Sequence, residues 1–110
     1  MNKARIKELT AGDIQEIAKT ELELRGCLVW RQNQIPQRFR KFRGKKGQSD
    51  LVGISKQGLF VGCEAKTLKD RLSKEQIEFL TEVKQRGGIA LIAIQDKHTG
   101  QFCMIEFKND

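Results

Sequence analysis

The feature that most constrains the fold is the run IALIAI at residues 89 to 94, in which every side chain is apolar. A strand with one solvent face alternates apolar and polar side chains, whereas a strand covered on both faces is apolar throughout. The run is far shorter than the roughly 20 residues that span a bilayer. It therefore predicts a buried strand inside a sheet that is covered on both sides.

The remaining periodicity supplies the covering helices and the other strands. Residues 13 to 25 carry apolar side chains at helical spacing and stop at Gly26, and residues 73 to 86 do the same and stop at Gly87-Gly88. The order α-β-β-β-α-β-β predicts an α/β fold with a central mixed sheet flanked by helices, in a single domain over residues 1–110. The expected buried helix positions are Ile14, Ile17, Ala18, Leu22, Ile77, Leu80 and Val83, and the further strand-like segments are 27–33, 50–54, 59–66 and 101–107.

Charge and cysteine content narrow the function. The net charge is +7, from 21 Lys and Arg against 14 Asp and Glu, and such a basic chain favours a polyanion, above all nucleic acid. No segment combines a wide apolar face with a lysine-rich face, so a membrane is not the expected partner. The three cysteines are widely spaced and His98 is the single histidine, which leaves too few ligands for zinc and indicates reduced thiols in the cytosol.

A basic segment without acids lies between the first two strand-like segments. It reads QRFRKFRGKKGQS at residues 37 to 49, with Phe39 and Phe42 interleaved among the cations. It can be an ordinary solvated loop, but a phosphate backbone would relieve the repulsion among its charges. The phenylalanines would then anchor it or stack on exposed bases. The predicted DNA-binding residues are Arg38, Arg40, Lys41, Arg43, Lys45 and Lys46, with Lys69 and Arg71 further along. Trp30, by contrast, alternates with Leu28 and is expected in the core rather than against a base.

Two carboxylates occupy neighbouring strand-like segments. If the hairpin turns about Gln57, Asp50 lies opposite Glu64, with Cβ atoms about 5 Å apart. Two ionised carboxylates at that distance repel each other, and a divalent cation removes the repulsion. Mg²⁺ takes oxygen ligands, often one or two carboxylates with waters and a substrate phosphate. The predicted ligands are therefore Asp50, Glu64 and the backbone carbonyl of Ala65.

Lys66 lies on the same strand face as Glu64, because side chains alternate along a strand. An ammonium cannot bind the metal, but it can hold an attacking water or stabilise charge on a phosphate in the transition state. The set suits phosphodiester hydrolysis. The alternative interpretation is structural, with Glu64 paired to Lys66 and Asp50 capping the loop.

Three motifs in order resemble a known family. GQSDLVG (47–53), GLFVGCEAK (58–66) and LSKEQIEFLTEVKQRGGIALIA (72–93) are similar to the virus-type replication-repair nuclease (VRR-NUC) domain of the PD-(D/E)XK restriction-endonuclease-like superfamily. The resemblance covers residues 13 to 94. It implies a DNA nuclease dependent on Mg²⁺ or Mn²⁺, with Asp50 and Glu64 as metal ligands, Lys66 as the catalytic lysine and Gln76 near the site.

The same resemblance implies a biological setting. Stand-alone members of this size resemble phage-encoded enzymes that act as homodimers on branched DNA such as Holliday junctions. The expected location is the cytoplasm, that of a bacterial host if the chain is phage-encoded. No membrane and no small-molecule cofactor are expected.

Two positions depart from the family pattern. Residue 49 is serine rather than the proline of the superfamily name. The acid that the family often places on its first helix corresponds by spacing to Gln15, which lies at the edge of the apolar face, while Glu16 lies on the far side of the helix but is chemically the better ligand. Gln15 is the preferred first-helix metal ligand and Glu16 the second choice.

Ser73 and Gln76 also have a purely structural explanation. They form S-x-x-Q, a capping box at the start of the second helix. A glutamine in the first helical turn can cap the backbone and still face the site, so the two interpretations are compatible.

Three other functions remain open on the sequence. The chain could be a nucleic-acid-binding module that keeps the fold without cleaving, although the presence of Asp50, Glu64 and Lys66 argues against this. It could be a flap or single-strand nuclease. A plain structural protein would tolerate the change Lys66→Ala with little effect.

Overall fold

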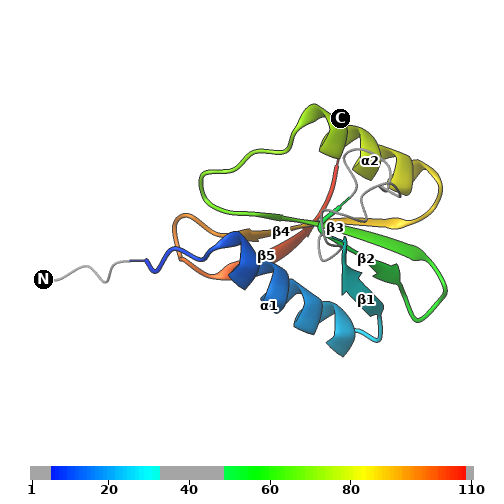
Figure 1. Cartoon of the computed structure of the whole chain (residues 1–110), viewed down its shortest axis with the longest axis horizontal. Coiled ribbons are helices and arrows are strands. Elements are labelled where there is room, and N and C mark those ends of the chain that lie inside the picture. Colours follow the sequence, from blue (N-terminus) through cyan, green and yellow to red (C-terminus); the bar gives the residue numbers. More distant parts are fainter. Residues whose placement is uncertain (1–5, 33–48, 109–110) are drawn as a thin grey trace, which may run out of the picture.

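The computed structural model describes residues 6–32 and 49–108, and in that part it confirms the predicted order of elements. Two helices flank a five-stranded mixed sheet, which makes the protein an α/β fold consistent with the restriction-endonuclease-like architecture (Figure 1). The elements are α1 (Ala11–Leu24), β1 (Leu28–Arg31), β2 (Leu51–Ile54), β3 (Phe60–Lys66), α2 (Lys74–Gln85), β4 (Ile89–Gln95) and β5 (Phe102–Glu106).

The strands follow chain order across the sheet, β1-β2-β3-β4-β5. β3 and β4 run parallel, and the other neighbouring pairs are antiparallel. A parallel pair cannot be joined by a tight turn, and here α2 makes the crossover. The carboxyl end of β3 therefore leads straight into the segment that begins α2.

Each helix covers a different face of the sheet. α1 packs on the face that carries Val61, Cys63 and Ala65, whereas α2 packs on the other face with a smaller cluster around Leu80. β4 contributes to both layers, because Leu91 and Ala93 belong to the α1 cluster and Ala90 belongs to the α2 cluster. This explains why the segment at 89–94 is apolar throughout, as predicted.

Capping residues set where α1 begins and ends. Thr10 and Asp13 form a capping box at its start, and Gly26, with φ of 89°, follows the last turn. Ile14, Ala18 and Leu22 are buried as expected, but Ile17 is 38% exposed. The prediction was wrong for Ile17, which lies at the margin of the buried stripe.

The expected burial of Trp30 was also wrong. Leu28 and Trp30 do share a face of β1, but they are 66% and 42% exposed, while Val29 between them is buried. The alternation of side chains along β1 was predicted correctly, but the face with Leu28 and Trp30 is the exposed one and the face with Val29 is the buried one. α1 packs on the side that carries Val29, and α2 on the opposite side packs mainly against β3 and β4.

Neither described helix is long and apolar enough to serve as a membrane span.

Candidate metal centre and active site

The β2–β3 hairpin brings two acids face to face. Leu51 pairs with Cys63, and one further step along the same register places Asp50 opposite Glu64, as the turn about Gln57 predicted. The backbone N–H of Ala65 donates a 3.0 Å hydrogen bond to Asp50 Oδ2. That bond holds the Asp50 carboxylate at the end of β3, beside Glu64.

Glu64 is a buried acid in an environment that disfavours its charge. Its side chain is 1% exposed. Burial first, then a hydrogen bond with Asp50 and the charge of Asp50, raise the pKa of Glu64 to about 9, while the charge of Lys66 acts in the opposite direction. Without a metal, Glu64 is therefore expected to keep its proton at neutral pH.

The two carboxylate oxygens of Glu64 differ in their hydrogen bonding. Gln76 Nε2 donates a 2.8 Å hydrogen bond to Glu64 Oε1. Glu64 Oε2 is buried, and within residues 6–32 and 49–108 it has no hydrogen-bond donor. A proton shared with Asp50 or a cation would satisfy it.

The start of α2 supplies the residue that holds Glu64. Ser73 is the N-cap and accepts from the backbone of Gln76 at 3.1 Å, and Gln76 Oε1 accepts from the backbone of Ser73 at 2.8 Å. The side-chain amide thus caps the helix with its oxygen and reaches Glu64 with its nitrogen. The capping role of Gln76 is thus observed, and it leaves the amide nitrogen in contact with Glu64, so the active-site role stays a prediction that is compatible with it.

The donor set fits a hard divalent cation. Two carboxylates, from Asp50 and Glu64, meet at the end of β3, where the Ala65 carbonyl is next in the chain. The described residues contain no group of three or more His, Cys, Asp and Glu side chains that could hold a metal. A cation here would accordingly take carboxylate oxygens, a carbonyl, waters and substrate phosphate, which is the pattern of Mg²⁺.

The first helix approaches the sheet from the other side. α1 covers the face of Cys63 and Ala65, opposite to the face of Glu64. Glu16 forms an ion pair with Arg31 on β1, a contact that spacing along the chain does not reveal. Gln15 is half-buried. The contacts that join Asp50, Glu64 and Gln76 include neither residue, and a first-helix ligand remains a prediction.

Ser49 directly precedes Asp50, and the sequence did not predict that it would be buried. It is fully buried, and in the described part of the chain its Oγ has no hydrogen-bond partner. A Cβ on Gly62 would lie 3.1 Å from this hydroxyl, so the glycine leaves room for it. The sequence marked Ser49 only as a replacement for proline.

The predicted DNA-binding cations fall into two groups. Lys69 and Arg71 are exposed in the segment between β3 and α2, where Lys69 Nζ lies 3.8 Å from a carboxylate oxygen of Glu8. The other six lie outside the described residues: Arg38, Arg40, Lys41, Arg43, Lys45 and Lys46.

Comparison with known proteins agrees with this geometry. No curated protein matches the sequence. The model of the VRR-NUC domain family matches residues 12–95, which include both helices almost completely and the strands β1 to β4. The chain therefore belongs to the VRR-NUC domain family, whose members are nucleases of the PD-(D/E)XK type.

Proposed function

We propose that the protein is a metal-dependent DNA endonuclease that hydrolyses phosphodiester bonds in branched DNA, as a homodimer. The observation that carries the proposal is the pairing of Asp50 with Glu64, whose buried Oε2 has no donor in the described structure. A buried oxygen beside a second carboxylate is costly unless a cation or a proton occupies the gap.

Each residue of the site would have a separate role. Asp50, Glu64 and the Ala65 carbonyl would hold Mg²⁺, with Mn²⁺ as a substitute. The ion would supply a bound water of lowered pKa and would neutralise charge on the phosphate. Gln76 keeps Glu64 Oε1 in a fixed orientation through its 2.8 Å hydrogen bond. In this scheme Gln15 or Glu16 would approach from α1, with Gln15 preferred.

Lys66 would act on the substrate rather than on the ion. It is half-buried at the end of β3 and lies on the face of Glu64. Its ammonium would hold the attacking water or stabilise the additional negative charge on the phosphate in the transition state.

The positive charge supports DNA as the substrate, and the resemblance to stand-alone junction-cleaving members of this size supports branched DNA. The net charge of +7 and the basic segment around Arg40 favour a phosphate backbone. One chain has one site, so two strands of a junction require two copies. The enzyme would act in the cytoplasm, where both DNA and Mg²⁺ are available.

A cleavage panel tests the proposal. Labelled duplex, nicked, flap and four-way DNA are incubated with Mg²⁺, Mn²⁺ or EDTA. We expect cleavage only with metal, fastest on four-way DNA, and a loss of about 10²-fold or more in Lys66→Ala. Lys97→Ala, which removes an exposed lysine from the β4–β5 turn, is the matched control and should cleave normally.

Several outcomes would contradict it. Cleavage in EDTA, or full activity of a folded Lys66→Ala protein, would contradict the mechanism. DNA binding without cleavage would favour the binding module, and faster cutting of flap or single-stranded DNA would favour the other nuclease.

A further inference from the structure

A row of large apolar side chains is exposed on the face of the sheet that α2 only partly covers. Leu28 pairs with Ile54, and Ile54 pairs with Phe60, so the three lie side by side across β1, β2 and β3. With Trp30 and Leu59 they form what we term the apolar face. The exposed fractions are 66% for Leu28, 42% for Trp30, 44% for Ile54, 43% for Leu59 and 41% for Phe60.

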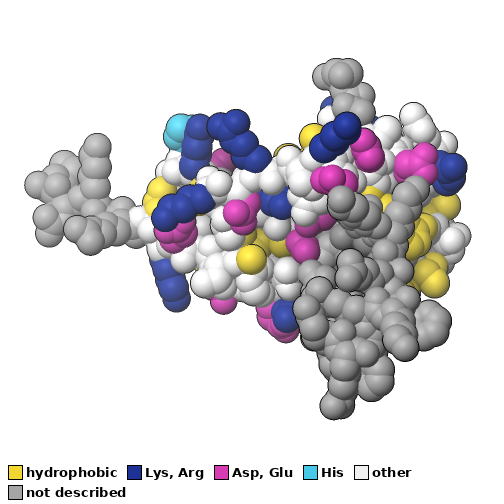
Figure 2. Space-filling view, turned by 45° about the horizontal axis from the view of Figure 1, so that its top comes forward, with side chains coloured by type: hydrophobic (Ala, Val, Ile, Leu, Met, Phe, Trp, Pro, Cys, Tyr) yellow, Lys and Arg dark blue, Asp and Glu magenta, His cyan; other side chains and the backbone are white. Residues whose placement is uncertain are grey.

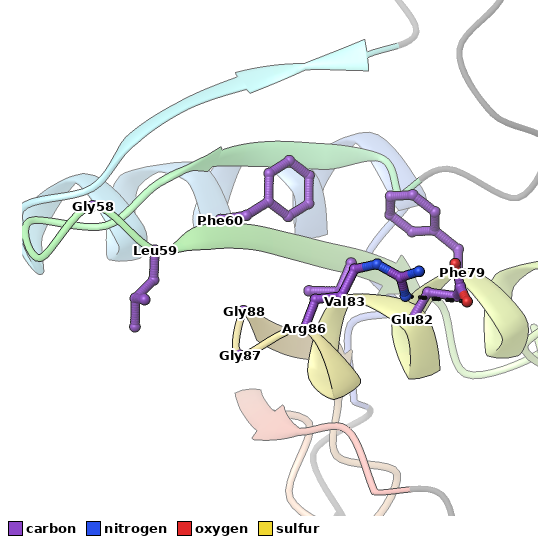
Figure 3. A pocket seen from close by; sticks show the side chains of 9 residues that line it. All are labelled: Gly58, Leu59, Phe60, Phe79, Glu82, Val83, Arg86, Gly87 and Gly88. Carbon is purple, nitrogen blue, oxygen red and sulfur yellow. Dashed lines mark ion pairs between the residues drawn. The ribbon is translucent and has the colours of Figure 1, made fainter.

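A groove runs beside this face. It has a volume of about 400 Å³ and lies between the start of β3 and the end of α2 (Figure 3). Phe60 and Phe79 meet edge to face along it, with ring centroids 6.4 Å apart, and Val83 lines its floor. Hydrophobic side chains gather at the end of the molecule that is opposite the N-terminal segment (Figure 2). Contiguous exposed apolar surface of this kind marks an interaction site.

We propose that the apolar face and its groove are the surface through which two copies of this chain associate. The inference builds on the homodimer of the proposed function and assigns its interface. A projecting row next to a groove suits a two-fold axis, because Leu28 and Ile54 of each copy then enter the groove of the other.

The charges around the groove point to a second copy. Glu82 and Arg86 line it and form an ion pair of 3.2 Å. Under a two-fold axis each acid can face the base of the other copy, so the rim is complementary to itself. DNA phosphates would instead seek the basic segments.

This interface would be centred away from the two carboxylates of the proposed active site. Glu64 lies four residues beyond Phe60 along β3, which is about 13 Å at 3.3 Å per residue.

Sedimentation and fluorescence test the inference on the full chain. We expect a dimer at micromolar concentration and a dissociation constant raised roughly 30-fold or more by Ile54→Glu or Leu28→Glu. Leu24→Glu, at a 79% exposed apolar position on α1, is the matched control and should stay dimeric. Trp30 is the single tryptophan and the chain has no tyrosine, so dilution should shift its emission to the red as the dimer separates.

A charge exchange provides a second test that does not touch the apolar side chains. Glu82→Arg and Arg86→Glu should each weaken the dimer, and the double exchange should restore it. Circular dichroism confirms that each variant remains folded.

The results of these experiments test the dimer interface and the nuclease activity independently. A dimer that Ile54→Glu disrupts, in a protein that cleaves no DNA, would support the interface and contradict the proposed function. A protein that cleaves four-way DNA as a monomer at every concentration would contradict both the interface and the homodimer, while it would support the nuclease activity. A Trp30 emission change on adding DNA, without association, would assign the face to nucleic acid and overturn the inference, and so would a dimer that Ile54→Glu leaves intact.

Discussion

At the scale of single residues, Glu64 binds its proton more tightly in the folded, metal-free protein than in the unfolded chain. In the unfolded chain it ionises near its ordinary value of 4.5, whereas in the folded protein its pKa is about 9. The folded state therefore binds more protons between these values, and stability is lost as the pH rises through them. The arrangement that would attract a cation also weakens the metal-free fold.

Replacing Glu64 with glutamine should remove this pH dependence. In EDTA, we expect the free energy of unfolding of the wild type to fall from about pH 5 to about pH 9, while that of Glu64→Gln stays nearly flat. At pH 8 the variant should be more stable by roughly 3–5 kcal/mol, because at that pH the wild type must take up a proton on folding and the amide need not. Urea unfolding across this pH range measures the effect.

Added Mg²⁺ provides the control for that experiment. It should stabilise the wild type and leave Glu64→Gln almost unchanged, because the variant lacks the second carboxylate. Parallel pH profiles for both proteins in EDTA would contradict the interpretation.

At the scale of elements, the capping box of α2 has two functions that mutation can separate. Ser73→Ala removes only the cap and should cost roughly 0.5–2 kcal/mol in stability with cleavage retained. Gln76→Ala removes part of the same cap and also the 2.8 Å hydrogen bond to Glu64, so it should reduce kcat as well. Unfolding and single-turnover cleavage of both variants give the comparison, and equal activity would show that Gln76 is only a cap.

β1 and β2 approach each other closely at Gly53. A Cβ on Gly53 would lie 2.2 Å from the backbone oxygen of Leu28, whereas a Cβ on Gly62 would meet the Ser49 hydroxyl at 3.1 Å. Gly53→Ala should therefore destabilise the protein by several kcal/mol, about 4 or more, and Gly62→Ala by much less. Thermal unfolding of the two variants checks this, and similar melting temperatures would show that β1 moves freely.

The helices and strands were predictable because each follows from a local sequence rule. The errors concern tertiary packing, which no local rule describes. Periodicity, the Ser73–Gln76 capping box and glycine stops predict the helices, and turn length predicts the opposition of Asp50 and Glu64. The capping box of Thr10 and Asp13 was found only in the structure. The exposure of Trp30 depends on how far α2 reaches across the sheet, which no local pattern reports. The lack of a hydrogen-bond donor to Glu64 Oε2 among the described residues likewise depends on which side chains pack around it.

At the scale of the whole molecule, the two proposed interactions differ in how strongly they depend on salt. DNA binding by a chain of charge +7 releases counterions, so its affinity should fall linearly on a log–log plot against salt. Association through the apolar face should weaken little, because salt screens the repulsion between copies. The double variant Lys69→Ala, Arg71→Ala should reduce the magnitude of the DNA slope by up to about 2. Titrations at several salt concentrations measure both, and a dimer that dissociates with rising salt would contradict this prediction.

The hydrogen bond from Gln76 to Glu64 joins the first turn of α2 to the proposed active site. Any fraying of that turn would release one carboxylate oxygen, and any ligand that fixes Glu64 would hold the turn closed. Amide hydrogen exchange at the beginning of α2 should therefore slow when a cation binds, even though the backbone amides there bind no metal. A helix end that looks purely structural would in this way report whether a cation occupies the proposed metal site.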